Sequence, residues 1–107
     1  MSNPARSIHA RLEGLLFGIS EAAAAVEPGD RKGAFLQSIS MILLEVSRHL
    51  RNLNGDDPVT RIFRDSFGRI SDLAREIETN PDLDDQLVAE IANRADLAMA
   101  NIEEKTF

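Results

Sequence analysis

The chain has 107 residues, of which 43% are hydrophobic and 28% are charged, a composition that fits one globular domain spanning 1–107 and argues against a disordered or fibrous protein. It contains no cysteine, which excludes disulfide frameworks, thiolate metal sites and cysteine nucleophiles. Its net charge of −6 has the wrong sign for binding a phosphate backbone, and no apolar stretch approaches the roughly 20 residues that a membrane-spanning helix needs. We therefore expect a cytoplasmic protein that binds neither nucleic acid nor membrane.

Prolines and glycines divide the chain into four segments of similar length. We expect one helix in each segment, over about 4–27, 31–54, 58–79 and 81–105. Three of them start at an Asn or Asp before a proline, because the side-chain oxygen accepts a free backbone N–H and proline tolerates the first helical position: Asn3-Pro4, Asp57-Pro58 and Asn80-Pro81. The remaining helix is expected to start after the turn Pro28-Gly29-Asp30, with Asp30 as its cap, and to end at Asn54-Gly55.

The first segment, 4–27, has the apolar spacing of an amphipathic helix. Apolar residues recur every three or four positions: Ile8, Leu12, Leu15, Ile19, Ala22 and Val26. Gly14 and Gly18 lie four residues apart on this helix, and each lowers helix stability by about 1 kcal/mol relative to alanine. We expect this pair to allow a close approach by the backbone of a neighbouring helix.

The second segment, 31–54, is apolar on two stripes. One stripe consists of Phe35, Ile39, Ile42, Val46, His49 and Leu53. A parallel stripe consists of Leu36, Leu43 and Leu50. Because both stripes need cover, we expect this helix to be the most buried of the four, with Ile39 and Leu43 in the core.

The third and fourth segments repeat the helical spacing. In 58–79 the apolar face contains Val59, Phe63, Ser66, Ile70, Leu73 and Ile77. In 81–105 it contains Leu87, Ile91, Ala95, Ala98 and Ile102. None of the four segments alternates with a period of two, so a sheet is not expected. Four matched helices joined by short turns predict an all-α antiparallel four-helix bundle, closed on itself or completed by dimerisation.

Charges on the last two helices have two interpretations each. On the third helix, Arg61, Asp65 and Arg69 follow one another at four-residue spacing, which is typical of a solvated face. The alternative is a partner-binding strip anchored by Arg61, Arg64 and Phe67, residue types enriched at interfaces. The acids Asp82, Asp84 and Asp85 fit the first turn of a helix, whose dipole favours negative charge. The alternative for these acids is calcium binding, although they lack the glycine and the bidentate glutamate of an EF-hand loop.

Both histidines have a glutamate four residues away. The pairs are His9 with Glu13, and Glu45 with His49. If the first two helices pair around Gly29, these four side chains lie at one height, and imidazoles with carboxylates can bind zinc or another divalent metal. The alternatives are structural histidines, each satisfied by a nearby acid, or a pH response.

No catalytic motif is present: the sequence contains no Gly-rich phosphate loop, HExxH or nucleophile elbow. We therefore expect a non-enzymatic helical-bundle protein without a cofactor, which acts through protein–protein interaction as an adaptor, regulator or small chaperone. Its predicted partners are another protein and a second copy of itself, as a homodimer. The alternative is a metal-binding bundle that uses His9, Glu13, Glu45 and His49.

Overall fold

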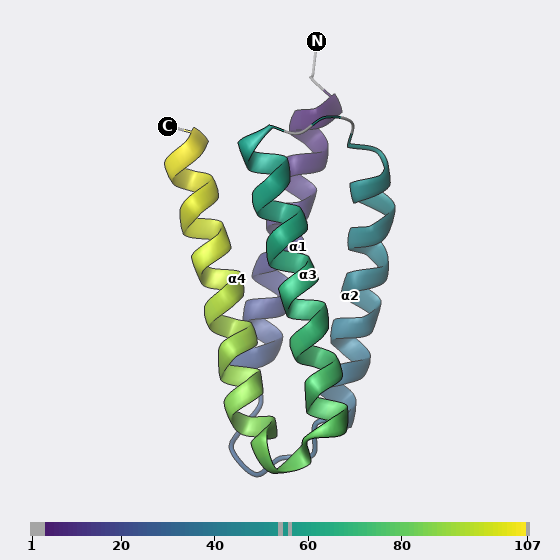
Figure 1. Cartoon of the computed structure of the whole chain (residues 1–107), viewed down its shortest axis with the longest axis vertical. Helices are drawn as coiled ribbons and strands as arrows, with labels where there is room; N and C mark the ends of the chain where they lie inside the picture. The colour runs from purple at the N-terminus through teal and green to yellow at the C-terminus, as the bar shows by residue number, and fades with distance from the viewer. Residues whose placement is uncertain (1–3, 54, 56, 107) are drawn as a thin grey trace.

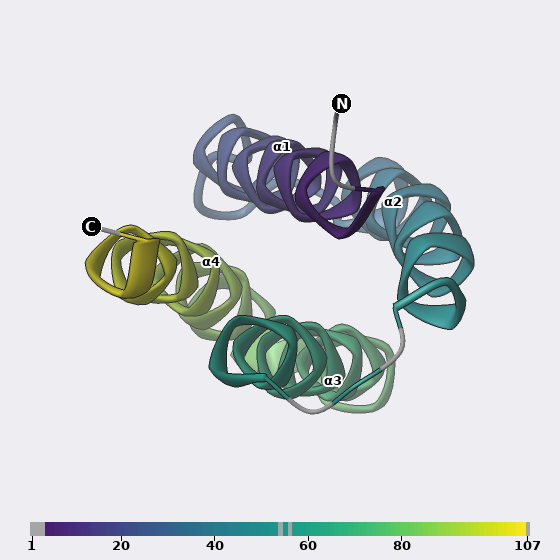
Figure 2. The same ribbon diagram turned by 90° about the horizontal axis from the view of Figure 1, so that it is seen from above.

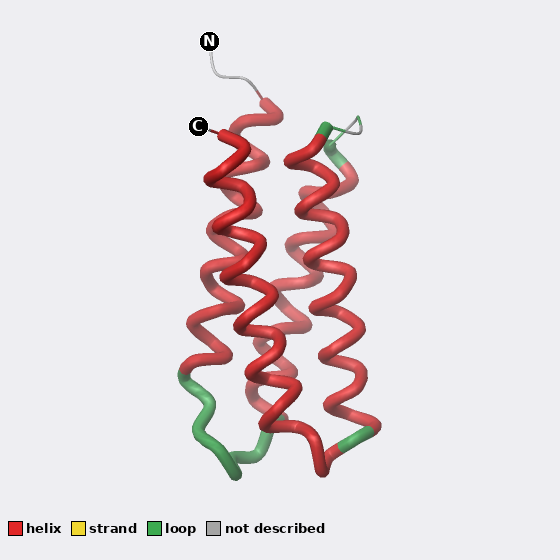
Figure 3. Tube along the Cα trace, turned by 60° about the vertical axis from the view of Figure 1, so that its left-hand side comes forward, coloured by secondary structure: helices red, strands yellow, loops and turns green. Residues whose placement is uncertain are grey.

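The computed structural model describes residues 4–53, 55 and 57–106, with side chains described for 6–53, 55 and 57–105. Over these residues the chain forms four α-helices and one 3-10 turn: α1 (Pro4–Ala24), α2 (Gly33–Arg51), α3 (Pro58–Thr79), η1 (Pro81–Leu83) and α4 (Asp84–Thr106). The described ranges contain no strand (Figure 3). The expected all-α four-helix bundle is confirmed.

The helices run alternately up and down, so that both termini lie at one end of a bundle measuring 48 × 25 × 20 Å (Figure 1). α4 packs extensively against both α3 and α1. α2 contacts α1 less, and its contact with α3 is the smallest between any two helices that follow one another in the chain. Viewed from above, α1 and α2 form one layer and α4 and α3 the other (Figure 2).

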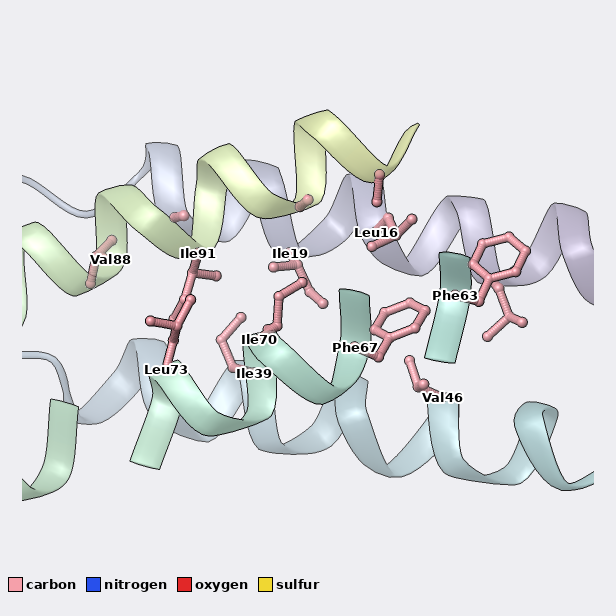
Figure 4. Packing of buried hydrophobic residues seen from close by; sticks show 14 of the residues in the cluster. Leu16, Ile19, Ile39, Val46, Phe63, Phe67, Ile70, Leu73, Val88 and Ile91 are labelled. Atoms are coloured by element: carbon pink, nitrogen blue, oxygen red, sulfur yellow. The ribbon is translucent and has the colours of Figure 1, made fainter. Parts of the chain in front are cut away.

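The core is built from the apolar stripes of all four helices. Ile19 of α1, Ile39 of α2 and Ile70 of α3 are completely buried and point toward one another (Figure 4). Other fully buried side chains continue the core along the bundle axis: Leu12, Leu16, Phe63, Ile91 and Ile102. Burial of each large apolar side chain stabilises the fold by about 1.5–3 kcal/mol relative to leaving it in water.

The prediction that the second helix is the most buried is wrong. α2 buries only Phe35, Ile39 and Val46, whereas α3 buries seven residues. The predicted second stripe of Leu36, Leu43 and Leu50 is only partly buried. The reason is that α2 makes little contact with α3, so Leu43 and Leu50 line a gap between the two helices.

The first hairpin loop is longer than expected, because α1 ends at Ala24 and α2 begins at Gly33. Asp30 is not the helix cap, since its Oδ2 accepts a hydrogen bond from the Glu27 N–H at 3.0 Å and thereby stabilises the loop. α2 also ends earlier than predicted, at Arg51, and the Asn52 N–H donates to the His49 carbonyl at 3.1 Å. Asn54 lies outside the described residues.

The bounds predicted for the third helix are confirmed at both ends. Asp57 is its N-cap, accepting from the Thr60 N–H at 3.2 Å and from the Thr60 hydroxyl at 2.6 Å. These hydrogen bonds to the carboxylate, the hydroxyl bond first, hold the pKa of Asp57 below its ordinary value. Asn80-Pro81 behaves differently, because Pro81 starts the 3-10 turn and α4 begins at Asp84. Asn3 lies outside the described residues.

The glycine pair on α1 does not bring two helix backbones together. A Cβ placed on Gly18 would meet the Cδ1 of Ile42 at 3.7 Å, an ordinary contact with a side chain of α2. A Cβ on Gly14 would meet nothing within 4 Å in the part of the chain that is described. The expected close approach is therefore wrong within one chain, because α2 presents a long isoleucine side chain at this height.

Candidate functional site: a groove between α2 and α3

The gap between α2 and α3 forms a groove of about 240 Å³. Val46 and Phe67, both buried, form its floor, and these side chains lie close together in Figure 4. Leu43 and Leu50 of α2 form one wall, and the polar or small residues Arg64, Gly68 and Ser71 of α3 form the other. The groove therefore combines an apolar floor with one wall of leucines and one wall of polar or small residues.

Gly68 leaves the backbone of α3 open to this groove. It is exposed in the middle of a helix, and a Cβ there would meet nothing within 4 Å in the described chain. Glycine at such a position costs about 1 kcal/mol of helix stability relative to alanine. No contact among the described residues requires that cost, so Gly68 is suited to a close approach from outside the chain.

Two of the three residues predicted as partner-binding anchors line this groove. Phe67 is buried in its floor, and Arg64 stands at one end. The Arg64 guanidinium donates to the carbonyl of Leu53 at 3.2 Å and to that of Gly55 at 3.4 Å, which ties the α2–α3 connection to α3. The third residue, Arg61, is exposed on α3 and is not part of the groove lining.

Next to the groove, α2 exposes large apolar side chains. Met41 is 67% exposed and Leu44 is 66% exposed, and their three-residue spacing places them side by side on the helix. Isolated exposed apolar residues are normal, but a continuous apolar patch marks an interaction surface. Leu44 lies three residues before Ser47, which lines the groove, and is therefore a surface neighbour of the α2 wall.

The predicted metal-ligand set is only partly assembled. Glu45 and His49 are paired on α2, with His49 Nε2 3.6 Å from Glu45 Oε2. His9 instead packs against Phe63 with the two rings tilted by 40° and a ring-centroid distance of 5.5 Å, and its Nε2 is buried with no hydrogen-bond partner among the described residues. Within those residues, no group of three or more His, Cys, Asp or Glu side chains is placed to hold one metal ion.

The acidic cluster after α3 has a role that its sequence pattern did not reveal. Lys32, 6% exposed, places its Nζ 2.6 Å from Asp85 and 3.7 Å from Asp84. The hydrogen bond from Lys32 is the main cause that holds the pKa of Asp85 below its ordinary value, and the same bond raises the pKa of Lys32. Sequence inspection missed Lys32, because no local spacing connects it with the start of α4.

A second hollow, of about 310 Å³, lies where α1 ends and α2 begins. Besides Val26 and Phe35, its lining consists of small or charged residues: Ala22, Ala25, Asp30, Arg31, Ala34 and Ser38. It lacks the leucines that give the α2–α3 groove its apolar wall, and we therefore take the groove as the candidate site.

No known protein family, curated protein or solved structure matches the chain. Within the described residues, none of the helices combines the length and the apolar character needed to cross a membrane.

Proposed function

We propose that this protein is a non-enzymatic helical bundle that binds a helix of a protein partner in the α2–α3 groove, as an adaptor, regulator or small chaperone. The observation that carries the proposal is the leucine-walled groove beside the open backbone of Gly68. The exposed side chain of Leu44, three residues before Ser47 of the lining, adds apolar surface at the edge of the groove.

The shape of the groove matches the common mode in which an amphipathic helix lies in an apolar groove. Such helices present anchors at spacings of three, four and seven residues. Leu43 and Leu50 of α2 are seven residues apart, which is about 10.5 Å or two helical turns. Opposite them, Gly68 and Ser71 leave room for the side chains of an incoming helix.

The chemistry of the lining favours binding over catalysis. Its polar side chains are Ser47, Arg64 and Ser71. A serine nucleophile requires an adjacent general base, and among the described residues that line the groove there is neither histidine nor carboxylate. Arg64 is also engaged with two backbone carbonyls of the α2–α3 connection.

Site-specific photo-crosslinking in the protein's own host tests this proposal. A benzoylphenylalanine at Ser47 or Ser71, both in the groove lining, should give protein adducts. The same group at Ala100, exposed on α4, is the control and should give none. Gly68→Leu, which meets no neighbour at its Cβ, should fill the groove and abolish the adducts while the helical circular dichroism is retained. Adducts that are equal at all three positions, or absent from both groove positions, would contradict the proposal.

A further inference from the structure

We infer that the helix which occupies the groove is α2 of a second copy of this chain, antiparallel to the first α2 in a two-fold symmetric dimer. This inference rests on the proposed function, because it names the occupant of the same groove. A two-fold interface requires one surface patch that is complementary to itself. α2 meets this requirement, since it forms a wall of the groove and also carries the unpartnered apolar side chains.

The face of α2 that would enter the partner is continuous over the whole helix. Residues at alternating spacings of four and three share one stripe: Leu36, Ser40, Leu43, Ser47 and Leu50. Leu44 and Arg51 lie beside this stripe and are exposed. The two serines are small enough for two α2 helices to approach each other, while the leucines supply the apolar contact.

Charge favours the antiparallel orientation. The last turn of α2 is basic, with Arg48 and Arg51 both exposed. Within one chain α2 runs antiparallel to α3, so this basic end lies beside Arg64 in the first half of α3. The second half of α3 is net acidic, with the three exposed acids Asp72, Glu76 and Glu78 against the two exposed arginines Arg69 and Arg75.

A partner α2 that runs antiparallel to the resident α2 is parallel to α3. It therefore brings the partner's Arg48 and the partner's Arg51 toward the acidic half of α3. A parallel pair of α2 helices would instead place these arginines at the end already occupied by Arg48, Arg51 and Arg64, where like charges repel.

The same geometry sets a register. With the two-fold axis midway between Ser40 and Ser47, each Ser40 faces the partner's Ser47, and Leu43 and Leu44 lie at the centre. The stretch 43–50 of α2 lies along 64–71 of α3 in the opposite direction. The partner's Leu44 consequently lies level with Ser71, one turn beyond the open backbone at Gly68.

The oligomeric state gives the first test. Sedimentation equilibrium should give the mass of two chains for the wild type and of one chain for Leu44→Glu. The matched controls Phe17→Glu and Leu97→Glu change exposed apolar residues on α1 and α4, 55% and 48% exposed, and should remain dimeric. Because all three side chains are exposed, their helical circular dichroism should match the wild type. A wild-type monomer, or a dimer lost in a control but kept in Leu44→Glu, would overturn the inference.

Disulfide trapping tests the orientation and register of the two α2 helices. Because the chain has no native cysteine, only the introduced cysteines can form a disulfide. Ser40→Cys mixed with Ser47→Cys should give a mixed disulfide between two chains, while each variant alone should give little. A parallel pair would reverse this result and overturn the antiparallel arrangement. Ser38→Cys mixed with Ser47→Cys is the control, because Ser38 lines the other hollow and should not crosslink.

Failure of this inference and failure of the proposed function give different results. A monomer that still gives groove adducts, at a mass other than twice that of the chain, overturns the dimer and leaves the groove as a partner-binding site. A monomer without groove adducts overturns both. Groove adducts at twice the mass of the chain support both.

Discussion

Lys32 and Asp85 connect the α1–α2 loop to the first turn of α4, with a distance of 2.6 Å between Lys32 Nζ and Asp85 Oδ1. The Gly29 N–H donates to the same carboxylate, at 3.1 Å to Oδ2. One carboxylate therefore fixes a loop lysine and a loop backbone group at the end of the bundle opposite the termini. This contact joins the first helical hairpin to the second.

Removing the two partners of this ion pair should have unequal effects. Asp85→Ala leaves the buried ammonium of Lys32 with only the more distant Asp84 and a backbone carbonyl, and a buried charge that loses its close partner is destabilising. Lys32→Met keeps the apolar volume and leaves Asp85, which is exposed. The urea midpoint should therefore fall further for Asp85→Ala than for Lys32→Met. Asp82→Ala, at an exposed acid nearby, is the control and should resemble the wild type. The reverse order would contradict the role assigned to Asp85.

Stability should fall at both extremes of pH. The pKa of Asp57 and the pKa of Asp85 are held low in the folded chain, so the unfolded chain binds more protons and stability is lost as pH falls below about 4. The raised pKa of Lys32 acts oppositely, since its contribution is present below about pH 10.4 and is lost as pH rises through its folded value. Urea unfolding from pH 3 to pH 11 measures both limbs. Asp85→Asn should reduce the loss of stability at acidic pH. An unchanged loss of stability in this variant would contradict the role of Asp85 in the pH dependence.

Asp57→Ala should destabilise the protein by about 1 kcal/mol, as the loss of an N-cap does. It removes the acceptor of both the Thr60 N–H and the Thr60 hydroxyl at the start of α3. Asp72→Ala, an exposed change within the same helix, is the control and should have no such cost. Chemical denaturation of the two variants in parallel measures the difference. Equal stability of both would show that the cap contributes nothing.

Truncating Ile39 and truncating Leu43, both on α2, should lower the stability of the protein by different amounts. Ile39→Ala removes a fully buried side chain and should cost about 2–5 kcal/mol. Leu43→Ala changes a partly buried side chain in the wall of the groove and should cost less, measured at a concentration where the chain is monomeric. Thermal unfolding of both variants checks this order. A larger loss for Leu43→Ala would restore the sequence-based expectation that the second stripe of α2 is core.

Local patterns were sufficient where a structure depends on neighbouring residues. Asp57-Pro58 predicted the start of α3 correctly, because both the cap and the proline act within the first turn. Asn80-Pro81 resembles it in sequence but opens a 3-10 turn. Asp30 also has the chemistry of a cap, yet its carboxylate bonds to the Glu27 N–H within the loop. Neither the Asn80 side chain nor the Asp30 side chain caps a helix, although both have the chemistry to do so.

The candidate site was only partly predictable. Arg64 and Phe67 were identified from residue type, and both line the groove. Gly68 and Ser71 were not, because a small residue on a helix has no distinctive spacing. The groove exists only where α2 and α3 make little contact, and that depends on how well their facing side chains pack.

The sequence by itself determined four amphipathic helices and their up-and-down order, because apolar periodicity and turn residues act over a few positions along the chain. Only the tertiary structure decided how the helices share their apolar surface. α4 is covered by α1 and α3, whereas α2 keeps Leu44 exposed and a groove beside α3. It also decided the pairing of Lys32 with Asp85. The physical reason is that both depend on distances between segments remote in sequence, which the packing of whole helices sets.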